Sequence, residues 1–218
     1  MRNSAAQSHL RFPLTRLLGN GGNIRVARAL MAYGAPLGAA QLAGDAGMTP
    51  QGTRLVLDGL VSQGLVRVLG QPRSQLFSVV ATHPFAAALR TLFEAERARW
   101  EGLQEALREC LAAQREVRSA WLYGSVARGE DAPHSDVDIA LVLNKDAPDT
   151  TGEVREALQI LGDRLLVHFS VVALTPIEVA KLAPRARWWA DVKRDAKVLK
   201  GASPRQEAAR CVRAAQHA

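Results

Sequence analysis

The chain has 218 residues, of which 48% are hydrophobic and 22% are charged, a composition typical of a folded globular protein. Its formal net charge of +7 is unevenly distributed: residues 1–82 carry eight arginines and no lysine against two aspartates, whereas the rest is nearly balanced. A polyanion could neutralise this excess charge and release counterions. We therefore expect nucleic acid as a partner of the N-terminal third.

The sequence argues against a membrane protein and against a disulfide-stabilised one. No stretch approaches the roughly 18 apolar residues of a membrane span, and the first residues lack the uninterrupted apolar run of a secretory signal. Cys110 and Cys211 are the two cysteines, and their spacing fits neither a disulfide framework nor a zinc cluster. We expect a cytoplasmic protein with no membrane association.

The N-terminal third begins with predicted helices. Two are expected over residues 23–33 and 37–46, and a third begins at Pro50, with Thr49 as its N-cap. The residues expected on the buried face of this third helix are Leu55, Leu57, Leu60 and Val61. Those expected at its exposed N-terminal end are Gln51, Thr53 and Arg54. Helix, short turn and helix form the helix-turn-helix arrangement.

A two-stranded hairpin is predicted next, because apolar segments at residues 65–69 and 75–80 flank a turn-forming cluster. Residues 23–80 resemble a winged helix-turn-helix domain of small bacterial repressors, and we assign the domain to residues 12–82. The resemblance implies binding to double-stranded DNA and transcription regulation. The alternative is a winged helix that binds protein. The expected DNA contacts are Gln51, Thr53, Arg54 and, at the hairpin tip, Arg73.

Residues 83–115 are predicted to form a long connecting helix, because apolar residues recur at spacings of three and four with a single glycine. Glu96 interrupts the apolar stripe. Over residues 83–114 the helix could form a homodimer by coiled-coil packing or pack on its own neighbouring domain. The spacing leaves both alternatives open.

The C-terminal part, residues 116–202, is predicted to form a small mixed sheet with helices on one face, which places the whole chain in the α+β class. Thr175 and Glu178 form a capping box at the start of one helix. Residues 203–218 are expected to be a frayed tail. Strands are expected over about residues 120–123, 138–143 and 166–173, and helices after residue 124 and over about residues 152–161 and 175–182.

The stretch YGSVARGEDAPHSDVDIALVL, residues 123–143, contains two chemical features. Asp136 and Asp138 lie two positions apart at the entrance of a strand, so both carboxylates project from one face, as a magnesium ion needs. Gly124 permits a sharp turn close to a phosphate, and Ser125 offers a hydroxyl and an N–H at the start of a helix. Together they point to nucleotide phosphoryl chemistry.

The Gly-Ser pair, ten intervening residues and Asp-x-Asp resemble the signature of the nucleotidyltransferase superfamily of DNA polymerase beta, especially its minimal bacterial members. The resemblance implies that Ser125 and adjacent N–H groups bind the β and γ phosphates of ATP or another nucleoside triphosphate. It implies that Asp136 and Asp138 bind two magnesium ions. Arg128 either contacts phosphate or forms a structural ion pair. Small relatives include antitoxins that modify a toxin, so a partner protein is an expected acceptor.

Active members of this superfamily carry a third carboxylate on a later strand, which activates the attacking hydroxyl. The corresponding segment here, FSVVALTP, has Ser170 at that position, and serine cannot act as this base at neutral pH. His168 is the nearest ionisable residue on the same side and could replace the base, or it could be a half-buried histidine without a catalytic role. Two interpretations follow: an enzyme that transfers a nucleoside monophosphate, with AMP favoured, and a catalytically degenerate regulator or antitoxin-like binding protein.

Overall fold

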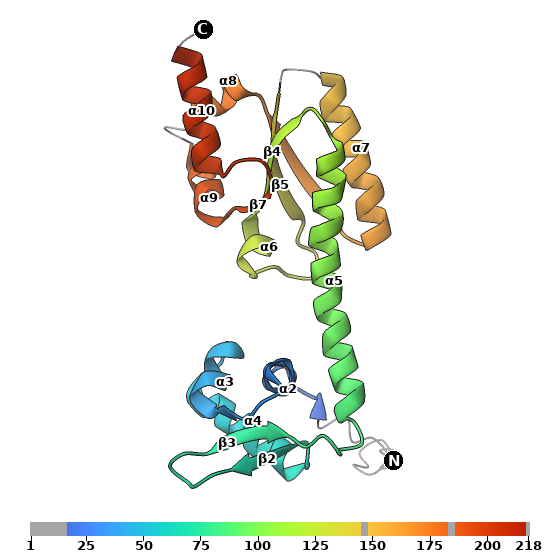
Figure 1. The fold of residues 1–218 in the computed structure, drawn as a ribbon, viewed down its shortest axis with the longest axis vertical. Helices are drawn as coiled ribbons and strands as arrows, with labels where there is room; N and C mark the ends of the chain where they lie inside the picture. The colour runs from blue at the N-terminus through green and yellow to red at the C-terminus, as the bar shows by residue number, and fades with distance from the viewer. Residues whose placement is uncertain (1–16, 145–147, 183–185, 217–218) are drawn as a thin grey trace, which may run out of the picture. The chain divides into compact units, whose positions relative to one another are not determined.

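The computed structural model divides into two compact units, residues 1–99 and 100–218 (Figure 1). It describes residues 17–144, 148–182 and 186–216. The first residues of the expected 12–82 domain therefore lie outside the described residues. No helix in the described ranges combines the length and apolar character needed to cross a membrane.

Over residues 17–82, the described part of the first unit contains helices α2, α3 and α4 and a three-stranded antiparallel sheet with the strand order β1-β3-β2. The expected hairpin is present, with Leu69 opposite Leu76 where β2 and β3 meet the turn. The expected second helix is shortened, because its first two residues pair with β3 as a strand. The elements are α2 (Gly21–Tyr33), β1 (Leu37–Gly38), α3 (Ala39–Asp45), α4 (Pro50–Ser62), β2 (Val66–Leu69) and β3 (Leu76–Val79).

Helix α4 begins as the sequence predicts. The Thr49 hydroxyl accepts a hydrogen bond from the Gly52 N–H at 3.2 Å, and Pro50 occupies the first helical position, where its missing N–H costs nothing. Gln51 and Arg54 are exposed at this end of the helix.

Two predictions about the faces of α4 are wrong. Thr53 is fully buried and its hydroxyl donates to the Thr49 carbonyl at 3.0 Å, so this side chain cannot reach DNA. Leu55, expected in the core, is 69% exposed. The reason is helical phase: Thr53, Leu57 and Leu60 share the buried face at spacings of four and three, which turns position 55 outward.

Helix α5 (Ala86–Ala113) contributes to both units. Within the first unit, Leu89 is buried and Glu96 pairs with Arg28 at 2.6 Å. Within the second unit, Leu103 and Leu107 are buried in the core. Packing on its own neighbours is therefore present in both units, whereas homodimerisation through residues 83–114 stays a prediction.

The second unit is built on a four-stranded mixed sheet of order β6-β5-β4-β7, in which β5 and β6 are parallel and the other pairs are antiparallel. Thr175 and Glu178 form the predicted capping box, with N–H to side-chain oxygen distances of 2.8 and 3.2 Å. The remaining elements are β4 (Val117–Tyr123), α6 (Gly124–Arg128), β5 (Val137–Leu143), α7 (Pro148–Leu165), β6 (Phe169–Leu174), α8 (Pro176–Leu182), α9 (Arg187–Asp195), β7 (Lys197–Lys200) and α10 (Pro204–Gln216).

Helices cover both faces of this sheet, so the prediction of helices on one face is wrong (Figure 1). Ile139 and Leu141 of β5 point to one face, where α5 and α7 pack. Ala140 and Val142 point to the other face, where α8, α9 and α10 pack. Every residue of β5 from Ile139 to Leu143 is apolar and buried, as expected for a strand covered on both faces.

The prediction of a frayed tail after residue 203 is also wrong, because residues 204–216 form α10. Cys211 and Glu207 of this helix are buried. The Glu207 carboxylate forms an ion pair with Arg118 at 2.7 Å and accepts a hydrogen bond from the Ser119 hydroxyl at 3.1 Å. The ion pair connects α10 to β4, and it supplies the buried Glu207 charge with the partner that such a charge needs.

Lys200 caps the C-terminal end of α5. Its ammonium group donates hydrogen bonds to the carbonyls of Leu111 and Gln114, both at 2.8 Å, which also accept the backbone N–H groups of Gln114 and Val117. We expect Lys200→Met to lower the free energy of unfolding by about 1–3 kcal/mol, measured by urea denaturation. Lys181→Met removes an exposed lysine of α8 and should change it by less than about 0.5 kcal/mol. Equal effects would contradict the capping role.

Candidate active site

The Gly-Ser turn lies directly against one of the two aspartates. Gly124 follows β4 with a φ of 77°, a left-handed conformation that favours glycine. A Cβ atom at this position would overlap with Asp138 Oδ2 and lie 3.1 Å from its Cγ. Tyr123 is the residue opposite Asp138 in the antiparallel pair of β4 and β5. The turn and the aspartate therefore form one site, and only glycine fits between them.

Asp136 and Asp138 lie at the start of β5, close enough for their charges to interact. Asp138 is half-buried, whereas the Asp136 side chain is 51% exposed. Burial raises the pKa of Asp138 and the charge on Asp136 raises it further, while a hydrogen bond from Ser170 and the charge on Arg128 lower it. Because two neighbouring carboxylates repel each other, a bound cation would stabilise both.

The parallel strand β6 brings two polar side chains to the aspartates. Ser170 is the register partner of Asp138, and its hydroxyl hydrogen-bonds to that carboxylate. His168 Nδ1 lies 3.0 Å from Asp136 Oδ1, and the His168 side chain is 65% exposed. Each aspartate therefore has its own partner on the neighbouring strand. Sequence alternation placed His168 on this side but did not identify its contact with Asp136.

A third carboxylate is not found beside the pair. Among the residues that the structure describes, no group of three or more histidine, cysteine, aspartate or glutamate side chains could hold a metal ion. The two aspartates nevertheless suit magnesium, which is usually held by one or two carboxylates together with substrate phosphates. Asp136 is exposed, Asp138 is half-buried and their negative charges repel each other, so this donor set fits the ion once a nucleotide supplies the remaining ligands.

Arg128 forms the structural ion pairs that were one of its two predicted roles. Its guanidinium lies 2.7 Å from Glu130 and 3.0 Å from Asp195 of α9. Asp195, whose side chain is 7% exposed, also binds Arg194 at 2.7 Å. The hydrogen bond from Arg194 is the main reason that the pKa of Asp195 is lowered. Arg128 thus holds α6 to α9 while its charge still reaches Asp138.

Two aromatic side chains lie next to the site and were not assigned to it from the sequence. Tyr123 is half-buried, and its hydroxyl accepts a hydrogen bond from Trp188 Nε1 at 3.2 Å. Their rings meet edge to face at 5.6 Å. Burial raises the pKa of Tyr123, and the charge on Asp138 adds to this effect. The contact between Tyr123 and Trp188 therefore holds the end of β4, directly before the Gly-Ser turn, against α9.

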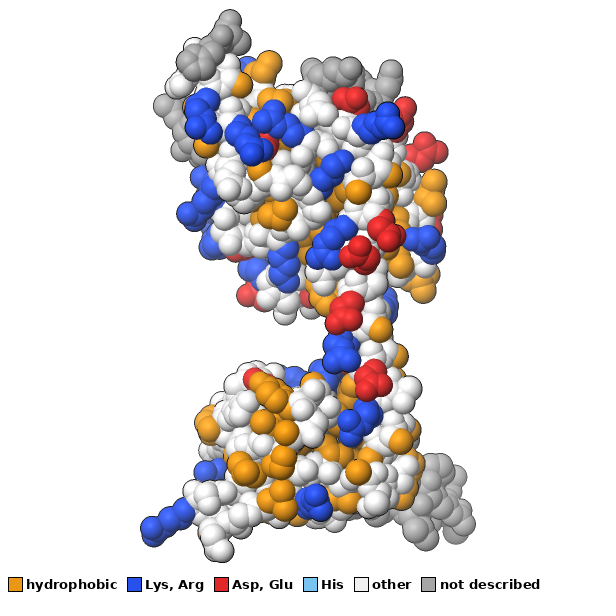
Figure 2. All heavy atoms as spheres, viewed as in Figure 1, with side chains coloured by type: hydrophobic (Ala, Val, Ile, Leu, Met, Phe, Trp, Pro, Cys, Tyr) orange, Lys and Arg blue, Asp and Glu red, His pale blue; other side chains and the backbone are white. Residues whose placement is uncertain are grey.

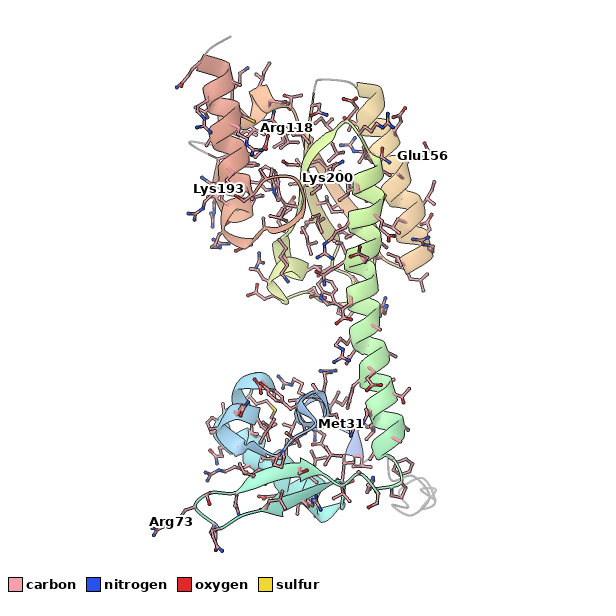
Figure 3. All side chains as sticks on the ribbon, in the orientation of Figure 1. Met31, Arg73, Arg118, Glu156, Lys193 and Lys200 are labelled. Carbon is pink, nitrogen blue, oxygen red and sulfur yellow. The ribbon has the colours of Figure 1, made fainter. Side chains whose placement is uncertain are left out.

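The candidate DNA contacts in the first unit are only partly accessible. Gln51 and Arg54 are exposed and lie on the same side of α4 because they are three residues apart. Arg73 is exposed in the hairpin turn and points away from the unit (Figure 3). Thr53 is buried, as described above, and does not join them.

Residues 105–184 match the family described as "Polymerase beta, Nucleotidyltransferase". The matched segment includes the Gly-Ser turn, both aspartates and Ser170. Together with the geometry above, this match defines the second unit as containing a nucleotidyltransferase-like domain. The match does not extend to α2, α3 and α4 or to the hairpin.

Several solved structures resemble this chain at low identity. One described as a toxin–antitoxin with AMP-PNP is 19% identical, with 52% of this chain and 87% of that chain covered and a TM-score of 0.37. The toxin–antitoxin MntA-HepT is 17% identical, with 54% and 87% covered and a TM-score of 0.35. PigF with SAH is 12% identical, with 82% and 63% covered and a TM-score of 0.26. No curated protein sequence matches the chain.

The raised pKa of Asp138 gives a testable titration. Because Asp136 raises it and Ser170 lowers it, Asp136→Asn should lower the Asp138 pKa and Ser170→Ala should raise it. In linkage terms, a raised folded-state pKa contributes stability below the unfolded-state pKa, and this contribution is lost as the pH rises through the folded value. Carboxyl chemical shifts measured by NMR against pH would report both changes, and shifts in the opposite directions would contradict the assignment.

Proposed function

We propose that the second unit binds ATP or another nucleoside triphosphate together with magnesium and transfers a nucleoside monophosphate, with AMP favoured, to an acceptor hydroxyl. The observation that carries this proposal is the contact between the Gly124-Ser125 turn and Asp138, with Asp136 beside it. In that arrangement the glycine turn lets a phosphate lie close to the backbone, and the two carboxylates supply oxygen ligands for a hard cation. The match of residues 105–184 to a nucleotidyltransferase family supports it.

In this proposal each residue has a defined task. Asp136 and Asp138 bind the magnesium that accompanies the nucleotide, and Ser125 with adjacent N–H groups binds the β and γ phosphates. Magnesium, when bound, neutralises phosphate charge and aligns the α-phosphate for in-line attack, with pyrophosphate as the leaving group. His168, 3.0 Å from Asp136, orients that carboxylate and is the candidate replacement for the third carboxylate.

The experiment is incubation of the protein with α-labelled ATP, magnesium and candidate acceptors, including co-expressed partner proteins. Label should be transferred to an acceptor by the wild-type protein, and Asp136→Ala should abolish the transfer. The exposed Asp131 offers a control in the same loop, and Asp131→Ala should retain it. Persistent absence of transfer with every acceptor would count against an enzyme.

A second candidate function is nucleotide binding without turnover, in a regulator or an antitoxin-like protein. The observation that favours it is Ser170, which stands opposite Asp138 where active relatives are expected to carry the third carboxylate. Calorimetric titration with ATP and magnesium, in wild type and in Ser170→Asp, separates the two functions. Binding without turnover in the wild type and gained turnover in the variant indicate a degenerate enzyme, whereas turnover in the wild type excludes it.

We also propose that the first unit is a winged helix that binds double-stranded DNA and regulates transcription, including that of its own gene. Residues 1–82 carry most of the excess positive charge, and Gln51 and Arg54 are exposed at the start of α4. The N-terminal end of such a helix is the part that enters the major groove, while Arg73 would contact phosphate or the minor groove.

Arg54→Ala and Arg73→Ala test this assignment separately. Loss of a base contact should cost about 1–3 kcal/mol and relax sequence preference, whereas loss of a phosphate contact should weaken all DNA sequences alike and reduce the salt dependence. Binding to the protein's own promoter, measured by fluorescence anisotropy at several salt concentrations, checks both. Binding that is insensitive to both substitutions and to salt would instead favour a winged helix that contacts protein.

A further inference from the structure

A groove outside the candidate active site lies between α9 and α10 of the second unit. Its volume is about 830 Å³. The lining residues are Ala190, Lys193, Arg194, Arg205, Ala208, Ala209, Val212 and Arg213. It contains neither aspartate of the candidate active site, so its purpose must be sought separately.

The groove has a small apolar floor with basic side chains around it. On α10 the lining residues recur at spacings of three and four from Arg205 to Arg213, so they form one stripe of about 12 Å, or two turns. Ala208, Ala209 and Val212 form its middle, with an arginine at each end. On α9, Ala190 faces the groove beside Lys193 and Arg194. An occupant with apolar and acidic groups would satisfy this surface.

Most of the basic side chains that line the groove form no ion pair with another described residue of the protein. Among the described residues, Lys193, Arg205 and Arg213 form no ion pair, whereas Arg194 is bound to Asp191 and Asp195. Figure 2 shows lysine and arginine side chains gathered on the side of the second unit where α9 and α10 lie, and Lys193 points outward from α9 in Figure 3. Charge complementarity therefore points to an anionic occupant.

The residues at the base of the groove indicate whether its anionic partner is a nucleic acid or a protein. Among the residues that the structure describes, no aromatic side chain lines the groove, so these residues offer no surface on which bases could stack. Small residues such as Ala190, Ala208 and Ala209 instead allow a helix backbone to approach closely, and aliphatic side chains can fill the space above Val212. An amphipathic helix that packs its apolar face into a groove is a recurring mode of recognition.

We propose that the α9–α10 groove binds an acidic amphipathic helix of a protein partner, with the apolar side chains of that helix on the alanine floor and its carboxylates on Lys193, Arg205 and Arg213. This interaction goes beyond nucleotidyl transfer, because it requires neither a nucleotide nor Asp136 and Asp138. It gives the protein a surface that holds a partner independently of catalysis.

The probe is a fluorescent synthetic peptide of about four helical turns, with leucines on one face and glutamates elsewhere, titrated into the full chain and followed by anisotropy. A peptide of the same composition, scrambled so that the leucines no longer share a face, should bind at least about tenfold more weakly. Arg205→Glu with Arg213→Glu should weaken the first peptide by a similar factor. Arg155→Glu with Arg164→Glu, which reverses two exposed arginines of α7, should not.

Ala209→Trp is a second test, which leaves the charge of the protein unchanged. Because the bulky side chain at this exposed position would fill the groove, this substitution should also reduce peptide binding. Circular dichroism checks that each variant folds. Equal binding of the two peptides, or binding unchanged by both groove variants, would overturn the proposal. Tighter binding of a single-stranded RNA, lost in the same variants, would also overturn it, as would a dimer of the free protein that Ala209→Trp dissociates in light scattering.

Discussion

Asp138→Asn should lower the rate of nucleoside monophosphate transfer by about 10³-fold or more. This corresponds to about 4 kcal/mol of transition-state stabilisation, which is the scale expected when a metal ligand at the reacting phosphate is lost. The same change should leave the nucleotide-free protein equally stable or more stable, because burial and Asp136 make the charged form of Asp138 unfavourable there. Initial rates with labelled ATP and thermal unfolding measure the two effects.

The matched control for this prediction is Asp131→Asn. Asp131 is an exposed carboxylate in the loop between α6 and β5, so its loss changes the net charge equally without touching the site. A rate that falls equally in both variants would assign the effect to charge. A destabilised Asp138→Asn protein would show that this aspartate has a structural role.

Gly124→Ala should have the second-largest effect. The new methyl group would overlap with the Asp138 carboxylate, so either the turn or the aspartate must move. Displacement of a reacting group by about 1 Å can cost about 100-fold in rate, and we expect transfer and magnesium-dependent nucleotide binding to fall at least that far. Calorimetry with a non-hydrolysable ATP analogue measures the binding directly.

Gly129 offers a control with the same backbone conformation. Its φ is 72°, close to the 77° of Gly124, but no atom lies within 4 Å of a Cβ built there. Gly129→Ala therefore pays the left-handed strain of about 1–2 kcal/mol without the clash. If both alanine variants lose nucleotide binding equally, strain in α6 is the cause and the contact with Asp138 is not.

Local signals in the sequence predicted local structure well. Thr49 with Pro50, and Thr175 with Glu178, mark helix starts that the structure confirms. These signals succeed because a cap satisfies backbone groups within three residues of itself. The Gly-Ser pair and the two aspartates were selected as a candidate site in the same way, from their spacing along a single stretch of chain.

Features that depend on packing between distant segments were not predicted. Thr53 was expected to be an exposed polar residue, but it lies on the face of α4 that packs against the core of the first unit. Residues 204–216 looked like a tail because their anchor, Glu207, is stabilised by Arg118, far away in the sequence. The contact of His168 with Asp136 needed the parallel register of β5 and β6, which spacing along the chain does not give.

We propose above all that Gly124, Ser125, Asp136 and Asp138 together bind a nucleoside triphosphate with magnesium. The most direct measurement is calorimetric titration of the wild-type protein with a non-hydrolysable ATP analogue, with and without magnesium, repeated with Asp136→Ala and Asp138→Ala. We expect magnesium-dependent binding in the wild type and at least about a tenfold weaker affinity in each variant. Absence of binding in the wild type, or binding that needs neither magnesium nor these aspartates, would contradict the claim.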